Sequence, residues 1–278
     1  MYSPAVRIGN WIEDLEKTKF FMSKRQREKL LIQRTRRSFD NLLKDVRLSM
    51  NNGFLQFGNC IQLKALDIPS SSPSVQLSKS QRLLCSNSYN DKYSLVMAGT
   101  VYDKHIGTIS SFVNDCRLIA SPMLNPCTRN CFVIKSADCD DRTGENVVFG
   151  QEFVLQVIAN NDREPLYVRA ENPLADDPHG PIEHNPIVLS NKKDRYSIWK
   201  VLHWNKDMRF ETEGEPFPAF KRIVIRHLMS GLNLTVEGTV WQLSIFGSEC
   251  GMSVHTYVDS SEQETAECGW MFITSTFN

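Results

Sequence analysis

The sequence lacks net charge, lacks apolar runs of membrane-spanning length and lacks an apolar signal segment at its start. Its 278 residues carry 32 Lys and Arg against 32 Asp and Glu. A balanced charge argues against a general nucleic-acid binder. No uncharged stretch approaches the roughly 20 apolar residues that cross a bilayer. We therefore expect a soluble, intracellular protein without nucleic-acid or membrane partners.

Patterns that carry catalysis are also missing. No Ser, His and Asp grouping lies in a nucleophile-elbow context, and no glycine-rich loop is present to bind phosphate. The segment 179–184 resembles an inverted zinc-protease motif, but it has one residue too many and contains a Gly-Pro that excludes a helix. Glu211, Glu213 and Glu215 surround Gly214 and read as a charged turn. We expect no enzymatic activity and no cofactor.

Eight cysteines are present, most of them singly in strand-like segments. Without a secretion signal, we expect reduced thiols that act as small apolar groups. Cys127 and Cys131, with Cys116 and Cys139 nearby, form the one cluster worth testing for zinc. Structural zinc sites usually use paired close spacings on two knuckles, and here one spacing stands alone. Free thiols and no metal are the expectation.

The zero total charge hides a basic N-terminal segment. Residues 1–47 hold twelve Lys and Arg against six Asp and Glu, so the rest of the chain is acidic by the same margin. Asn10 with Glu13, and Ser23 with Gln26, have the spacing of helix capping boxes. Apolar residues then step by threes and fours until the Asn-Asn-Gly at 51–53. The pattern predicts an extended lead followed by a basic helical arm over residues 1–50.

Basic side chains of this arm are the candidate partner-binding residues. They are Lys24, Arg25, Arg27, Lys29, Arg34, Arg36 and Arg37. Two interpretations stay open at this point. The helix either presents an ordinary solvated face or docks electrostatically onto an acidic partner.

After residue 54 one short phrase occurs three times. It reads aromatic, glycine, two variable residues and alternating apolar residues at 57–63 and 149–155, and a degraded copy without the glycine follows at 219–225. Each copy leads into three further strand-like pieces. These are 83–86, 95–97 and 131–134 in the first unit, 165–168, 187–189 and 198–201 in the second, and 232–235, 254–258 and 269–273 in the third.

Three units of four strands predict an all-β fold, and we interpret them as a β-trefoil over residues 54–278. The recurring glycine fits a bend or a close approach of two chain segments. An irregular β-sandwich is the alternative. Unequal insertions near 68–74, 103–126 and 176–181 are expected to form surface loops where such a scaffold places its specificity.

Several segments resemble the cilia- and flagella-associated protein 161 family. They are Val6 to Trp11, Lys29 to Arg34, Pro126 to Asn130, Phe210 to Pro216 and His255 to Asp259, together with Trp199. The resemblance spans essentially the whole chain and implies a trefoil similar to the MIR modules of calcium-release channels and mannosyltransferases.

The same resemblance implies a function. Family members are microtubule inner proteins on the luminal wall of the A-tubule of axonemal doublet microtubules. Tubulin and neighbouring inner proteins are then the expected partners, the cilium or flagellum axoneme is the expected location, and no catalysis is implied. Two rivals stay open: a cytoplasmic ligand-binding module, lectin-like or MIR-like, and an RNA binder that uses the basic arm.

Overall fold

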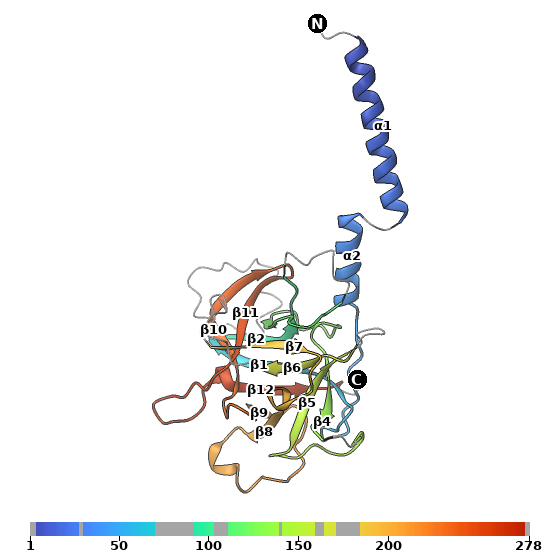
Figure 1. Cartoon of the computed structure of the whole chain (residues 1–278). Coiled ribbons are helices and arrows are strands. Elements are labelled where there is room, and N and C mark those ends of the chain that lie inside the picture. Colours follow the sequence, from blue (N-terminus) through green and yellow to red (C-terminus); the bar gives the residue numbers. More distant parts are fainter. Residues whose placement is uncertain are drawn as a thin grey trace.

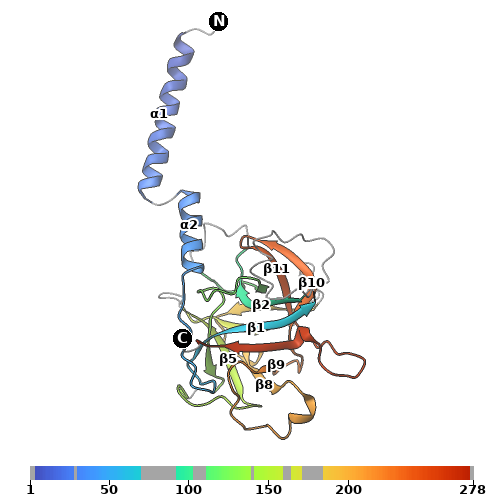
Figure 2. The same cartoon turned by 180° about the vertical axis from the view of Figure 1, so that it is seen from behind.

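The protein consists of a helical arm and a body of β-strands (Figure 1). The structure, a computed structural model, describes residues 4–27, 30–69, 92–102, 111–138, 141–158, 164–170 and 184–275. The arm contains α1 (Pro4–Gln26) and α2 (Leu31–Leu42), and it leads away from one end of the body in both views (Figures 1 and 2). No helix in these described ranges is both long and apolar enough to cross a membrane.

Twelve strands follow the arm within the described residues. They are β1 (Cys60–Pro69), β2 (Lys92–Gly99), β3 (Leu118–Ser121), β4 (Phe132–Ser136), β5 (Glu152–Val157), β6 (Tyr167–Ala170), β7 (Asn185–Ser190), β8 (Trp199–His203), β9 (Arg222–His227), β10 (Leu234–Ser244), β11 (Gly247–Val254) and β12 (Gly269–Ile273). Short 3-10 turns lie at Arg195–Ser197, Lys206–Met208 and Ala266–Cys268. The all-β prediction for the body is confirmed.

The predicted β-trefoil is wrong as an architecture. The strands do not divide into three four-strand units but form one antiparallel sheet in the order β10-β11-β3-β2-β1-β12-β9-β8-β5-β6-β7. Pairing of β11 with β7 closes ten of these strands into a barrel, and β4 bridges β1 and β5. Pairs such as β1–β12 and β8–β9 join strands of different repeats. The repeat predicts where strands lie, but an alternating strand does not specify its hydrogen-bonding neighbour.

Strand positions were predicted better than strand partners. Two strands are exceptions: β3 lies in the stretch 103–126 that was expected as a loop insertion, and β11 ends at Val254, where a strand over 254–258 was expected. The predicted strand 83–86 and the loop residues 70–74 and 176–181 fall outside the described residues. A strand as short as β3 inside a long insertion carries too few alternating residues to stand out.

The threefold phrase marks one recurring backbone turn. Gly58 and Gly150 have positive φ angles of 87° and 80°, and Phe220, where the third glycine is missing, has a φ of 64°. The N–H of each donates, at 2.8, 2.8 and 3.1 Å, to a carbonyl on the closing strand of its own repeat: Ile134, Val201 and Phe272. The turn is therefore preserved even where the chain bears the strain of a side chain in the left-handed region.

A ring of backbone hydrogen bonds joins the segments that enter the three repeats. Leu55 N–H donates to Phe217, Phe217 N–H to Val147, and Val147 N–H to Leu55, over 2.8 to 3.4 Å. All three side chains are buried. The ring fixes these segments against one another, so loops that leave them have a rigid base.

Large aromatic side chains fill the core. Trp199 and Trp270 are fully buried, and each indole N–H donates to a carbonyl, on Val168 at 3.1 Å and on Leu234 at 2.8 Å. Burial of an aromatic ring without an unpaired donor is strongly favourable. The barrel interior is therefore filled by side chains, and the barrel can hold its surface loops and the arm in fixed positions.

The arm differs in detail from its sequence-based prediction. The first residues were expected to be extended, but α1 begins at Pro4, a residue well suited to the first turn of a helix. The chain breaks between Gln26 and Leu31, close to the predicted break at Ser23. The second helix ends at Leu42 rather than at Asn51, because residues 42–46 pair with the barrel loop 126–129.

Candidate functional site: the N-terminal arm

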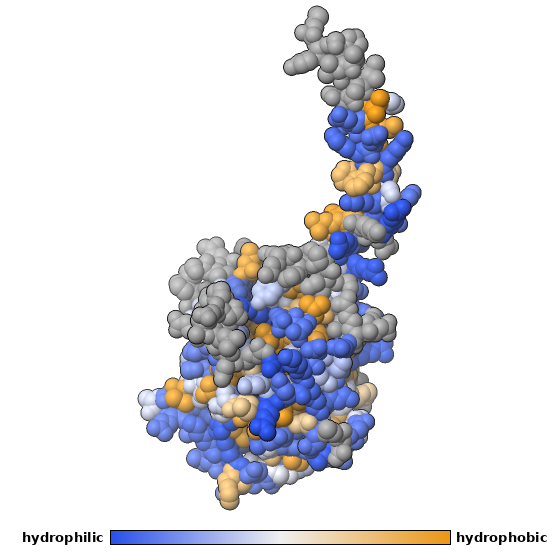
Figure 3. Space-filling model, in the orientation of Figure 1, coloured by the Kyte–Doolittle hydropathy of each residue, from blue (hydrophilic) through white to orange (hydrophobic). Residues whose placement is uncertain are grey.

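The described side chains of α1, from Trp11 to Gln26, are all exposed except that of Ser23, which is half-buried. The large apolar side chains of α1 are exposed: Trp11 by 64%, Ile12 by 48%, Leu15 by 38%, Phe20 by 56%, Phe21 by 56% and Met22 by 55%. Apolar and polar atoms alternate along the arm in the space-filling view (Figure 3). A soluble monomer rarely leaves so many apolar side chains together in water, so this surface has the character of a binding site.

The exposed apolar residues lie partly on one helical face. At 100° per residue, Trp11, Leu15 and Met22 fall within a narrow stripe, and Ile12 extends it. Full burial of each such side chain is worth about 1.5–3 kcal/mol. A lone helix without tertiary packing is only marginally stable in water. A partner that covered this stripe would therefore stabilise α1 and gain binding energy.

The structure places the predicted basic residues along both helices. Lys24 and Arg25 lie in the last turn of α1, and Arg27 follows directly. Arg34, Arg36 and Arg37 lie on α2, and Lys29 is outside the described residues. The six described side chains are all exposed. The prediction that they form a partner-binding surface stays a prediction.

One hydrogen bond joins the two helices within this basic region. The Gln33 side chain donates to the Arg25 carbonyl at 3.1 Å, which ties the end of α1 to the start of α2. Such a bond satisfies one of the carbonyls that a helix end leaves unpaired. On α2 the buried side is formed by Ser38 and Leu42, so Arg36 and Arg37 lie on the opposite side of the helix, whereas Arg34 is one turn from Ser38 on the same side.

In contrast to α1, helix α2 is firmly attached. Leu42 is buried at 2% exposure, and its carbonyl accepts from Arg129 N–H at 3.0 Å. Phe39 meets Phe246, in the hairpin between β10 and β11, edge to face at 5.3 Å between ring centroids. These contacts attach α2 to the barrel, and α1 has no comparable attachment among the described residues.

A buried ion pair supports that base. Arg129 and Glu249 form a 2.6 Å bond between Nη2 and Oε1, and both side chains are almost wholly buried. The guanidinium lies 3.8 Å from the centre of the Phe246 ring, and Arg129 Nε also donates to the Gly99 carbonyl at 3.1 Å. Ser244 Oγ donates to the second Glu249 oxygen. The pair thus orients Phe246 for its contact with Phe39.

Sequence reasoning found the charge of the arm but missed its uncovered apolar stripe. The signal was present, because Trp11, Leu15 and Met22 have helical spacing. A helix was expected from Asn10 onward, but an apolar face was predicted only for the segment that begins near Leu31, so the stripe on the first helix was missed. Sequence reasoning also missed the Arg129–Glu249 pair, since 120 residues separate its members.

A second polar cluster lies at the seam where β7 closes against β11. Glu237 is buried and accepts from Tyr257 Oη at 2.7 Å, from His184 Nδ1 at 2.8 Å and from Ser253 Oγ. His184 stacks on His255 at 3.8 Å between ring centroids. Burial favours a raised pKa for Glu237, but these hydrogen bonds outweigh it and lower the pKa.

We interpret this cluster as a structural link that holds β7 against β11. In the described part of the chain, no group of three or more His, Cys, Asp and Glu side chains is arranged to hold a metal ion. His184 is the one described residue of the zinc-protease-like segment 179–184. Cys116, Cys127 and Cys131 are buried free thiols, and Cys139 lies outside the described residues.

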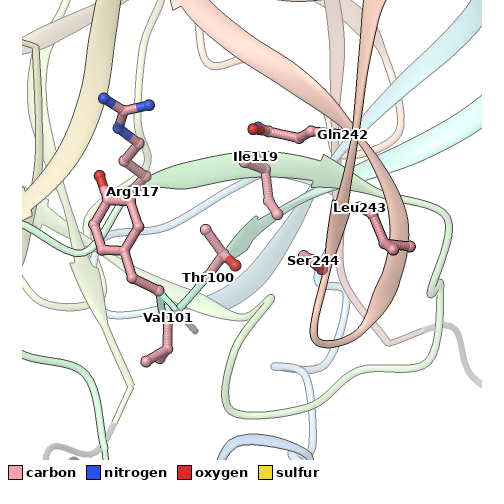
Figure 4. Close-up of a pocket in the computed structure, with 8 residues that line it drawn as sticks. Thr100, Val101, Arg117, Ile119, Gln242, Leu243 and Ser244 are labelled. Atoms are coloured by element: carbon pink, nitrogen blue, oxygen red, sulfur yellow. The ribbon is translucent and has the colours of Figure 1, made fainter. Parts of the chain in front are cut away.

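One pocket of about 430 Å³ opens between the end of β2, the start of β3 and the end of β10. Its lining residues are Thr100, Val101, Tyr102, Arg117, Ile119, Gln242, Leu243 and Ser244. Figure 4 shows Ile119 on β3 between Arg117 on one side and Gln242 and Leu243 of β10 on the other. A ligand-binding module would use a space of this kind. That alternative stays a prediction.

Comparison with known proteins places the chain among relatives of one kind. The family "Cilia- and flagella-associated protein 161-like domain" matches residues 34–173 and 178–275. Cilia- and flagella-associated protein 161 of Bos taurus is 28% identical over 99% of this chain and 82% of its own length. The Mus musculus protein of that name is 27% identical over 99% of this chain and 88% of its own length.

Solved structures show likeness of fold alone. Part of the S. cerevisiae protein O-mannosyltransferase Pmt1-Pmt2 complex superposes with a TM-score of 0.50 at 12% identity, covering 86% of this chain and 28% of that one. The family match extends over most of the barrel and takes in α2 from Arg34 onward. The chain belongs to the cilia- and flagella-associated protein 161 family.

Proposed function

We propose that this chain is a non-enzymatic structural component of motile cilia and flagella, a microtubule inner protein bound to the luminal wall of the A-tubule in axonemal doublets. Family membership supports the cilium and flagellum as its location. The observation that carries the binding role is α1, a helix whose apolar and basic side chains nothing in the described chain covers. Tubulin and neighbouring inner proteins are the proposed partners.

Charge and apolar area would contribute to this binding in different ways. The basic side chains from Lys24 to Arg37 attract an acidic surface such as that of tubulin, and salt screens the attraction within about 8 Å at physiological ionic strength. The stripe of Trp11, Leu15 and Met22 contributes by burial, which salt does not weaken. Weak contacts repeated along a lattice then hold the protein at high local concentration.

Fractionation of axonemes tests the location. An inner protein should stay with doublet microtubules through high-salt washing and leave only when the tubules themselves dissolve. Release by salt alone would contradict the luminal assignment, because a protein enclosed by the tubule wall cannot exchange freely.

Charge reversal tests the role of the arm. We expect Arg25, Arg27 and Arg36→Glu to reduce retention in axonemes, with the barrel still folded by circular dichroism. The matched control reverses three exposed basic residues of the barrel, Lys192, Arg195 and Lys221, and should be retained normally. Equal incorporation of both variants would show that the barrel loops, not the arm, bind the partner.

A further inference from the structure

The loop between β8 and β9 presents an apolar side chain in an acidic setting. Phe210 is 89% exposed, and Met208 beside it is 37% exposed. Four exposed carboxylates surround them in the acidic turn, which we define as residues 207–215: Asp207, Glu211, Glu213 and Glu215. The sequence predicted a charged turn here but gave no reason for a phenylalanine at its tip.

The acidic turn is held in one conformation. Arg209 points inward, where Nε donates to the His203 carbonyl at 2.9 Å and Nη2 to Glu264 at 2.9 Å. Thr212 is buried, and its N–H and Oγ1 both donate to the Met208 carbonyl, at 3.0 and 2.7 Å. A ring exposed on a fixed turn costs little conformational entropy to bind, as in a preorganised contact point.

The carboxylates of the turn have no basic partner of their own. Among the described residues, none of the four takes part in an ion pair, because the nearby cations Lys206, Arg209 and Arg226 all face the buried Glu264. The turn therefore offers negative charge around an apolar tip. Its complement is a basic surface with exposed apolar side chains.

That complement is present at the other end of the same chain. From Lys17 to Arg27 the arm holds five basic residues and no acidic one, and exposes Phe20, Phe21 and Met22 among them. Figures 1 and 2 place the β8–β9 loop at the end of the barrel away from the arm, so one copy cannot join its own two surfaces. We propose that the acidic turn binds the α1 arm of a second copy of this chain.

The contact is head to tail, so a pair of copies joined by it still has one unused arm and one unused turn. Such heterologous contacts continue as open chains, or close into rings where the rotation between copies allows it. The contact area of one helix and one turn is small, so it belongs to the weak, transient class. Phe210 would insert between side chains of successive turns of α1, as a knob into a hole.

Sedimentation velocity of the purified full-length protein, without tubulin, tests the inference. We expect the weight-average sedimentation coefficient to rise with protein concentration and to fall again with added salt. F210A should shift the onset of association to at least tenfold higher concentration, while L243A, at another apolar residue that is 85% exposed, should leave it unchanged. Equal loss in both variants would contradict a specific role of the turn.

Reciprocal charge reversal makes the test decisive. The turn variant E211K/E213K/E215K and the arm variant K24E/R25E/R27E should each stay monomeric, since like charges then meet. An equimolar mixture of the two should associate again, because each variant's arm complements the other's turn. Monomeric wild-type protein at all concentrations, or a mixture that stays monomeric while wild type associates, would overturn the inference. Sedimentation is measured without tubulin, so it tests self-association alone, and the high-salt washing of axonemes tests the proposed location separately.

Discussion

The exposure of three tryptophans shows how the barrel and the arm differ. Trp199 and Trp270 in the barrel have no exposed area, whereas Trp11 on α1 is 64% exposed. The barrel tryptophans also satisfy their N–H groups internally. The residue type is the same, so the difference lies in what surrounds it. The barrel is complete by itself, and the arm presents the kind of surface that a partner completes.

The two helices of the arm differ in the same way. Helix α2 is joined to the barrel through Phe39, Leu42 and the backbone after it, whereas α1 is tied to α2 by the Gln33–Arg25 hydrogen bond and leaves its described apolar side chains exposed. Substitutions in α2 and in its barrel contacts should therefore lower the free energy of unfolding, whereas substitutions in α1 should weaken partner binding alone. The predictions below separate these effects, beginning with the largest.

Loss of one partner of the buried ion pair should have the largest effect. We expect Glu249→Gln to destabilise the protein by about 3–5 kcal/mol, because it leaves the charge of Arg129 buried without a counter-charge. Chemical denaturation measures the change. The double variant R129M/E249Q should be more stable than E249Q alone. If both variants unfold at the wild-type denaturant concentration, the pair does not support the hairpin.

Removal of the Phe246 ring should loosen the packing of α2 on the barrel without unfolding the barrel. Phe246→Ala removes a partly buried ring and its contact with Phe39, for which we expect a loss of about 2 kcal/mol, below the 3–5 kcal/mol typical of a fully buried ring. Hydrogen exchange should then quicken in α2 and stay unchanged in β5 and β8. Unchanged exchange in α2 would show that Leu42 alone holds the helix.

The sequence predicted local structure well and pairing poorly. Alternating residues and turn residues located most strands, and the glycines at 58 and 150 lie at bends, as expected, where the structure gives them positive φ angles. The closed ten-strand order was not predictable, because hydrogen bonds between repeats leave no trace in the repeated phrase. The basic residues of the arm were predicted from charge alone. The exposure of Trp11 and Phe210 could not be predicted, because it depends on which side chains the tertiary structure covers.

Acid should weaken the barrel through a buried histidine. His227 contacts the Tyr196 carbonyl at 3.0 Å and Ser230 Oγ at 2.9 Å, and its burial lowers its pKa. The charge of Arg169 lowers the pKa further, and that of Asp194 opposes this. In the unfolded chain the pKa is about 6.5. The unfolded state therefore takes up a proton first, and stability should fall as pH falls below that value.

Denaturation at several pH values checks this effect. The free energy of unfolding should decline between pH 7 and pH 5 in the wild type and decline less steeply in His227→Gln. A variant at the half-buried His203 serves as a control for loss of an imidazole. An identical slope in wild type and His227→Gln would show that another group, such as His255, dominates the acid response.

The smallest effect on stability should come from charge reversal in α1, the helix proposed to bind the partner. Reversal of Lys24, Arg25 and Arg27 to Glu changes the charge of exposed side chains, and the Gln33 hydrogen bond uses the backbone carbonyl of Arg25 rather than its side chain. We therefore expect the free energy of unfolding to stay within about 0.5 kcal/mol of wild type. The matched substitution Leu42→Ala, on the attached helix, should cost about 2–5 kcal/mol, because it empties a buried site. Thermal unfolding of the two variants compares them directly. A large loss in the α1 variant would mean that α1 contributes to the folded barrel, and it would remove the argument that its exposed side chains are kept for a partner.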